Sequence, residues 1–208
     1  MKFGFGRKPF VIIAPIVAKL DKLFDDDPKL GERLVRRNTV YRGRSVDFRV
    51  DEIRLPNGAT ATREFLDHPG AVGVVPVRPG NKIVLVRQYR YPVGQVTLEL
   101  PAGKFDKGSD ESAEDCARRE LREETGYTAK TLKPLITYWP TAAFANEVLY
   151  LFIADKLSAG AVDPDEDEFI EKVELPLDKA LALVKNGRIK DSKTVIGLLS
   201  YALWYRKG

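Results

Sequence analysis

Three closely spaced glutamates are the clearest candidates for chemistry in this 208-residue chain. Glu120, Glu123 and Glu124 fall in residues 112–125, which the sequence pattern predicts to be a helix ended by Gly126. Residues three and four apart are neighbours on a helix, so the carboxylates share one face. Like charges this close repel one another unless a cation neutralises them. Hard oxygen ligands of this kind suit Mg²⁺ or Mn²⁺.

An ordinary solvated helix is the alternative interpretation, with ion pairs from Glu114 to Arg118 and from Asp115 to Arg119. The position of the helix argues against it. The helix follows a predicted buried strand and a Pro-Ala-Gly loop, and an apolar stripe that begins at Ala113 runs beside the acidic residues. We therefore expect a helix that packs on a sheet and presents its carboxylates at the edge of the packed face.

The elements around this helix indicate an α/β domain. Residues 71–78 and 82–90 are rich in Val and Ile and flank a Pro-Gly turn, which is typical of strands buried on both faces. Alternating residues near 46–50 and the turn at 56–58 predict a small antiparallel hairpin before them. Further elements are expected as strands at 95–100, 132–138, 148–154 and 169–175, and as helices at 177–185 and from Asp191 onward.

The composition narrows the class of protein. Lys and Arg number 34 against 30 Asp and Glu, and 44% of the residues are hydrophobic, so a soluble globular chain is expected rather than a disordered one. The single cysteine, Cys116, excludes an intramolecular disulfide and a zinc site built on several thiolates. We expect a reducing, cytoplasmic location.

The excess of basic residues lies in the first quarter of the chain. Acidic residues are interspersed there, so we expect no nucleic-acid partner. The apolar run at residues 10–18 is interrupted by Pro15 and is far shorter than the roughly 20 residues that span a bilayer. We do not expect a membrane-surface function. The alternative interpretation of this apolar run is an amphipathic segment that packs on the surface of a partner.

The residues around the predicted helix resemble the box of the Nudix hydrolase family, Gly-x5-Glu-x7-Arg-Glu-U-x-Glu-Glu-x-Gly-U, where U is apolar. Gly103, Glu111 and residues 119–127 supply every fixed residue type. Seven residues rather than five separate Gly103 from Glu111, which indicates a two-residue insertion near Asp110. From Glu111 onward the motif is in register.

Further motifs resemble the ADP-ribose pyrophosphatase branch of that family. They are Arg63-Glu64, His68-Pro69-Gly70-Ala71-Val72, Arg87-Gln88-Tyr89-Arg90, Glu99-Leu100-Pro101-Ala102-Gly103 and Asp191-Ser192-Lys193-Thr194. The resemblance implies a Nudix-type α/β/α sandwich with a mixed sheet, preceded by a small N-terminal antiparallel β element. It divides the chain into an N-terminal extension (1–38), a β element for dimerisation (39–70) and a Nudix hydrolase domain (71–208). A homodimer through the β element is implied.

The same resemblance implies roles in metal binding. Glu120 and Glu124 would bind the metal directly, with Glu123 and the backbone carbonyl of Ala102 completing the shell. Arg119 would orient the glutamates, and Gly103 would let the chain turn sharply. Glu111 is equally well explained as a cap of the helix and as a metal ligand.

The catalytic base would come from the acidic run at residues 163–168, where we favour Glu168 over Glu166. A merely solvated acidic loop is the alternative. Arg90, Glu99 and Arg63 are candidates for contact with phosphate or with the adenosine, although each could instead form an ion pair at a strand edge. Glu123 and Arg119 would act with the base in catalysis.

The implied activity is Mg²⁺-dependent hydrolysis of ADP-ribose, or of a related nucleoside diphosphate sugar, to AMP and a sugar phosphate, with Mn²⁺ as a possible substitute. Thr141-Ala142-Ala143 stands where the branch has Ser-Pro-Gly, so a different nucleoside diphosphate derivative remains an alternative. A non-catalytic regulator that binds ADP-ribose is a second alternative. The intact glutamates argue against it.

Overall fold

The computed structural model describes residues 22–106, 110–160 and 169–206. The chain divides into two compact units, of which one comprises Met1–Thr39 with Val50–Arg63 and the other Val40–Arg49 with Glu64–Gly208. In the described part, no helix is both long enough and apolar enough to cross a membrane.

A four-stranded sheet precedes the main domain. Its strands are β1 (Arg33–Arg36), β2 (Thr39–Arg42), β3 (Asp47–Arg54) and β4 (Thr60–Asp67), and a short 3-10 turn, η1 (Lys22–Phe24), lies before them. β3 pairs with the other three strands. β3 and β4 are the two strands of the predicted hairpin, joined at Gly58, whose φ of +82° favours glycine. The sequence did not predict β1 or β2, because strands of four residues carry too few apolar positions to show a period.

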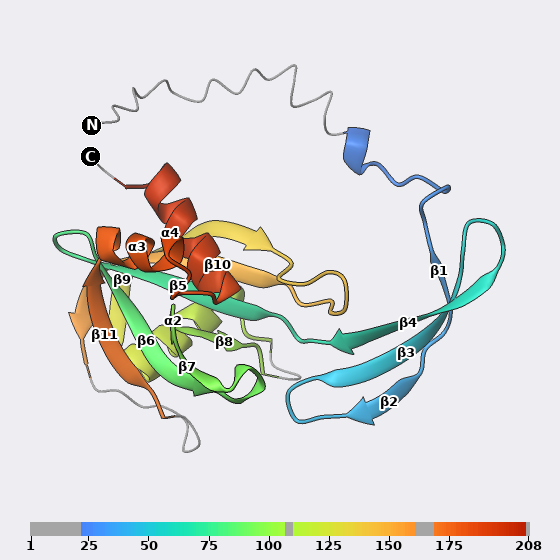
Figure 1. Ribbon diagram of the computed structural model, residues 1–208, viewed down its shortest axis with the longest axis horizontal. Helices are drawn as coiled ribbons and strands as arrows, with labels where there is room; N and C mark the ends of the chain where they lie inside the picture. Colours follow the sequence, from blue (N-terminus) through green and yellow to red (C-terminus); the bar gives the residue numbers. More distant parts are fainter. Residues whose placement is uncertain (1–21, 107–109, 161–168, 207–208) are drawn as a thin grey trace. The chain divides into compact units, whose positions relative to one another are not determined.

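The main domain is built on a seven-stranded mixed sheet (Figure 1). Its strands are β5 (Ala71–Arg78), β6 (Lys82–Arg90), β7 (Gln95–Glu99), β8 (Ala102–Lys104), β9 (Tyr127–Tyr138), β10 (Leu149–Ala159) and β11 (Glu171–Pro176). The central path runs β11-β6-β5-β10-β9, while β7 pairs with β6 and β8 pairs with β5. β5 and β10 are parallel, whereas β10 with β9, β11 with β6, β5 with β6 and β8, and β6 with β7 are antiparallel. A 3-10 turn, η2 (Tyr91–Val93), links β6 to β7.

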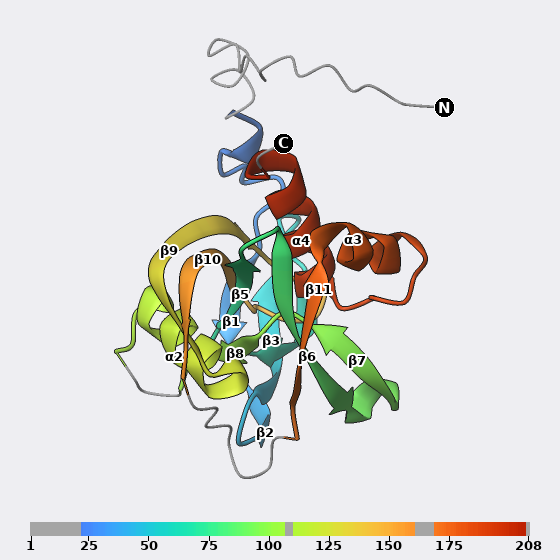
Figure 2. The same ribbon diagram turned by 90° about the vertical axis from the view of Figure 1, so that its left-hand side faces the viewer.

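Helices cover both faces of this sheet, as Figure 2 shows. The helices are α2 (Ala113–Thr125), α3 (Leu177–Lys185) and α4 (Ser192–Trp204). Alternate residues of β5 separate the faces, since Val72 and Val74 pack with Leu121 of α2 whereas Val75 packs with Leu198 of α4. The predicted α/β/α sandwich is therefore confirmed.

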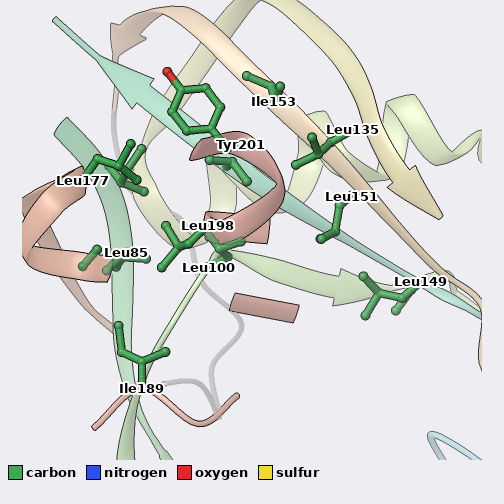
Figure 3. Close-up of a cluster of buried hydrophobic side chains, with 14 residues drawn as sticks. Leu85, Leu100, Leu135, Leu149, Leu151, Ile153, Leu177, Ile189, Leu198 and Tyr201 are labelled. Carbon is green, nitrogen blue, oxygen red and sulfur yellow. The ribbon is translucent and has the colours of Figure 1, made fainter. Parts of the chain in front are cut away.

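The larger hydrophobic core lies between the sheet and the pair α3 and α4 (Figure 3). Its fully buried leucines come from β6, from the segment after β7, from β10 and from both helices: Leu85, Leu100, Leu151, Leu177 and Leu198. Because Leu100 directly follows β7 and precedes the Pro-Ala-Gly segment, this core holds that segment in place.

The ends of α2 lie where the sequence predicts them. The Ser112 side chain accepts a hydrogen bond from the backbone N–H of Asp115 (3.1 Å), and Gly126 ends the helix with a φ of +70°. Strands β9 and β10 are longer than predicted. They continue as a ladder from the pair Asp155 and Thr131 to the pair Ala159 and Tyr127, where mixed polar side chains hide the strand pattern.

Candidate active site

The backbone beside α2 brings the predicted metal ligands together. β8 pairs antiparallel with β5, with Gly103 opposite Val72 and Ala102 opposite Gly73. The backbone N–H of Ala102 donates to Oε2 of Glu124 (2.9 Å), and Glu124 is only 3% exposed. This bond joins the Pro-Ala-Gly segment to the last turn of the helix.

Gly103 makes room for a second carboxylate. A Cβ atom at this position would lie 1.9 to 2.3 Å from the carboxylate atoms of Glu120, a distance that no side chain tolerates. The absence of a side chain at Gly103 therefore lets Glu120 approach the backbone. Glu120 and Glu124 both lie against the Ala102–Gly103 segment, as the predicted metal site requires.

Arg119 links Glu111, which precedes α2, to two glutamates of the helix. Its guanidinium donates to both carboxylate oxygens of Glu111 (3.0 and 3.1 Å), to Glu120 (2.7 Å) and to Glu123 (3.0 Å). The hydrogen bond with Glu111, followed by the charge of Glu120, raises the pKa of Arg119. The same bond lowers the pKa of Glu111. Arg119 thus contacts two of the three predicted metal-binding glutamates and orients them.

The solvated-helix alternative is only half correct. The pair from Glu114 to Arg118 forms (2.7 Å). Arg119, however, pairs with Glu111, Glu120 and Glu123. Asp115 instead accepts a hydrogen bond from the hydroxyl of Ser112 (2.6 Å). Asp115 lies in the first turn of α2, where its carboxylate binds the N-cap residue Ser112. Arg119 is therefore free of Asp115 and pairs with the glutamates.

These side chains suit a divalent cation. They offer carboxylate and carbonyl oxygens, and the two cations Arg119 and Arg122 that pair with them carry less charge than Glu120, Glu123 and Glu124 together. No preassembled group of three acidic, His or Cys side chains is present among the residues that the structure describes. A metal ion would therefore draw the carboxylates together from their contacts with Arg119 and with the backbone of Ala102.

A buried ion cluster lies beside this segment. Glu99, the last residue of β7, is 1% exposed and accepts two hydrogen bonds from Arg90 (both 2.8 Å) and one from the hydroxyl of Thr97 (2.7 Å). Lys193 of α4 also donates to Glu99, and to Asp191 (3.0 Å). The carboxylate of Glu99 therefore fixes the positions of two cations.

The environment of Glu99 shifts its pKa strongly. Burial raises the pKa, but the hydrogen bond from Arg90 and the charge of Lys193 outweigh burial and lower it to about 2. A carboxylate with a lowered pKa stabilises the folded state above its unfolded pKa, which for Glu is about 4.3. That stabilisation is lost as the pH falls towards 2.

We expect the free energy of unfolding to fall between about pH 4.3 and pH 2, with a slope that depends on Glu99. Glu99→Gln removes the titrating group, so chemical denaturation of this variant across that range will show a flatter profile. Glu171→Gln is the matched control, because Glu171 pairs with Arg87 at an exposed position. Equal slopes for wild type and Glu99→Gln would contradict the assignment.

A cavity of about 330 Å³ is lined both by the Ala102–Gly103 segment and by Arg90 and Lys193 of the ion cluster. Its basic side chains are Arg90, Lys104 and Lys193, and Ala102 and Gly103 also line it. The cavity can therefore take an anion close to the segment that Glu120 and Glu124 contact. His68, Pro140, Glu147, Asp191 and Ser192 also line it.

Sequence reasoning missed Lys193 as a site residue. It lies 94 residues from Glu99, and only the fold brings the two together. The Asp-Ser-Lys-Thr motif that contains Lys193 could have indicated that this segment belongs to the site. Asp191 caps α4 by accepting from the backbone N–H of Thr194 (3.0 Å), and the hydroxyl of Thr194 accepts from the backbone N–H of Leu100 (2.8 Å). These bonds place the start of α4 against the Pro-Ala-Gly segment.

Other predicted residues lie elsewhere. Arg63 belongs to the N-terminal unit, where its guanidinium pairs with Glu32 (3.0 Å), and its contact with substrate remains a prediction. Glu166 and Glu168 lie outside the described residues. Cys116 is buried, and burial raises the pKa of its thiol to about 12, which suits a packing residue.

Comparison with known proteins decides the family. A model of the NUDIX domain matches residues 67–196. The chain belongs to the Nudix hydrolase family. It is 43% identical to the methanol dehydrogenase activator of Bacillus methanolicus, with 86% of this chain and 94% of that protein covered. It is 40% identical to the ADP-ribose pyrophosphatase of Bacillus subtilis, with 85% of this chain and 92% of that protein covered.

One further relative and one solved structure extend the comparison. The GDP-mannose pyrophosphatase of Yersinia enterocolitica is 37% identical, with 67% of this chain and 76% of that protein covered. A crystal structure of an ADP compounds hydrolase superposes with a TM-score of 0.73 at 24% identity, covering 84% of this chain and 95% of that one. The solved structure supports the fold, and the resemblance to the Nudix family is confirmed.

Proposed function

We propose that this Nudix hydrolase cleaves the diphosphate bond of ADP-ribose, or of a related nucleoside diphosphate sugar, to give AMP and a sugar phosphate. The observation that carries the proposal is the gathering of Glu120 and Glu124 at the Ala102–Gly103 backbone, which forms part of a cavity lined by basic residues. The 40% identity to an ADP-ribose pyrophosphatase supports this substrate class.

The chemistry requires that water attack one phosphorus while the other phosphate leaves. Arg90 and Lys193, which line the cavity and both donate to Glu99, would hold the phosphate oxygens. Glu120, Glu123, Glu124 and the carbonyl of Ala102 would hold Mg²⁺, or Mn²⁺ in its place. The bound ion would neutralise the diphosphate and lower the pKa of the attacking water.

Acidic residues complete the proposed mechanism. Arg119 keeps Glu120 and Glu123 oriented through its hydrogen bonds. The proton of the attacking water would pass to Glu168 or, as the second choice, to Glu166. Separate Gln variants of these two residues will identify the base, because its loss lowers kcat by about 10² to 10⁴.

The choice of sugar is tested with a panel of substrates. Pro140, which lines the cavity, precedes the turn at Thr141, where the backbone N–H of Phe144 donates to the carbonyl of Thr141 (3.2 Å). We expect ADP-ribose to give the highest kcat/KM among ADP-ribose, ADP-glucose and GDP-mannose. Chromatography of the products should show AMP and ribose 5-phosphate. No turnover of any of the three in Mg²⁺ or Mn²⁺ would refute the proposal.

A non-catalytic regulator is the second candidate function. The 43% identity to a protein named as an activator of another enzyme favours it. Calorimetry and a turnover assay on the same sample separate the two candidates. Tight binding of ADP-ribose without hydrolysis would favour the regulator, whereas product formation favours the enzyme.

We also propose a homodimer formed through the N-terminal β element (39–70), with 1–38 as an extension and 71–208 as the catalytic domain. Apolar side chains of β2 in this element are exposed, including Val40 and Tyr41. An apolar surface of this kind is typical of an interface between subunits. Sedimentation equilibrium should give twice the chain mass, and Tyr41→Glu should shift the protein towards monomer.

A further inference from the structure

A second cavity lies at the opposite end of the strands that form the candidate active site. It has a volume of about 270 Å³ and is lined by Val77 of β5, Lys133 of β9, Ile153 and Asp155 of β10, Asn81, and Tyr201 and Tyr205 at the end of α4. The first cavity is lined by Ala71 and Leu149 of the same parallel strands. At 3.3 Å per residue, about 20 Å separates the two cavities.

The register of the strands explains why these side chains meet. Lys133 is paired with Ile153, and Asp155 lies two residues further along β10. The three side chains therefore share the face of the sheet that α4 covers. Ile153 and Tyr201 are buried members of the large core, so the wall of the cavity is apolar apart from a few polar groups.

Asp155 and Lys133 are oppositely charged, yet they do not pair. Oδ1 of Asp155 is buried without a hydrogen-bond partner in the described part of the chain. Lys133 is exposed, and it makes no ion pair with a residue that the structure describes. A buried carboxylate oxygen without a protein donor is costly, and a donor group that enters the cavity, from water or from a ligand, satisfies it.

The surroundings of Asp155 indicate the size and polarity of that ligand. Burial, followed by the charge of Asp155, raises the pKa of Tyr201, so the carboxylate lies near the tyrosine ring. The hydroxyl of Tyr201 makes only a long hydrogen bond to Oδ1 of Asn81 (3.4 Å). An acceptor, a cation and an apolar wall are thus available within one small cavity.

We propose that this second cavity binds a small zwitterion with an apolar body, of the kind that an aliphatic amino acid represents. The ammonium group would donate to Asp155, the carboxylate would meet Lys133, and the aliphatic part would contact Val77 and Ile153. An inorganic ion satisfies only one of the two charged side chains. The cavity does not include the glutamates of α2, so this site is independent of the proposed hydrolysis.

Calorimetry of the full chain with L-leucine tests the proposal. We expect Asp155→Asn and Lys133→Gln each to weaken binding by about tenfold or more, since each removes a charged partner. The amine and the acid that correspond to leucine, 3-methylbutan-1-amine and 4-methylpentanoate, should each bind more weakly than leucine. Glu171→Gln, on exposed β11, is the control variant and should bind leucine as the wild type does.

Thermal unfolding of the variants separates a binding role from a structural one. Without ligand, Asp155→Asn should keep or raise the Tm, because it removes a carboxylate whose buried Oδ1 has no donor among the residues that the structure describes. Lys133 is exposed, so Lys133→Gln tests binding even if Asp155→Asn folds poorly. The proposal is overturned if leucine, valine and methionine all fail to bind at about 10 mM, or if leucine binds both variants with wild-type affinity.

Discussion

Replacement of Glu124 by Gln is expected to lower kcat for hydrolysis of ADP-ribose by at least about 100-fold. Glu124 is almost fully buried and accepts a hydrogen bond from the backbone N–H of Ala102. Glutamine has nearly the same shape and keeps one oxygen for that bond. It lacks the negative charge that a divalent cation needs, so the loss falls on activity rather than on folding.

Initial rates at saturating substrate, measured over a range of Mg²⁺ concentrations, check this prediction. Glu114→Gln is the matched control, because Glu114 lies on the same helix and pairs with Arg118 at the surface. The control should keep wild-type kcat and the same dependence on Mg²⁺. If Glu124→Gln had near-normal kcat, Glu124 would not be a metal ligand.

Replacement of Gly103 by Ala is the second large effect that we expect. The new methyl group would overlap the carboxylate of Glu120, which would have to leave its place against the backbone. A displaced metal ligand lowers kcat by about 100-fold. The displaced group is the end of a flexible side chain, so the loss of stability should be only about 1 kcal/mol.

A large loss of kcat together with a small loss of stability distinguishes a displaced Glu120 from general misfolding of Gly103→Ala. Gly31→Ala is the control, since among the described residues a Cβ at Gly31 would meet only the carbonyl oxygen of Asp27, at an ordinary distance of 3.6 Å. Kinetics and thermal unfolding should show a large loss of kcat with a small change in Tm for Gly103→Ala, and neither change for Gly31→Ala. Normal kcat in Gly103→Ala would contradict the placement of Glu120.

Local signals in the sequence predicted much of the fold and the side chains that the structure brings together beside α2. Ser112 and Gly126 set the ends of α2 because capping and the left-handed conformation depend on single residues. The strands β5 and β6 were evident because both faces of their central residues are buried. The spacing of Glu120, Glu123 and Glu124 predicted a shared helix face, and the Nudix motif assigned it to chemistry.

Long-range contacts could not be read from the sequence. Glu99 and Lys193 meet only because α4 begins beside the segment that follows β7, so Lys193 was missed although Arg90 and Glu99 were candidates. Arg119 was expected to orient the glutamates, but its bidentate pairing with Glu111 depends on where the loop before α2 returns to the helix. In both cases the local sequence identified one residue of the pair, but its partner is determined by the tertiary structure.

Release of AMP from ADP-ribose by the purified 208-residue chain tests the central claim most directly. With Mg²⁺ present, the account predicts turnover at about 1 s⁻¹ or faster, which is typical of enzymes, and complete loss of activity in excess EDTA. The products should be AMP and ribose 5-phosphate in equal amounts. AMP release no faster than that of a protein-free blank, in Mg²⁺ or in Mn²⁺, would contradict the claim.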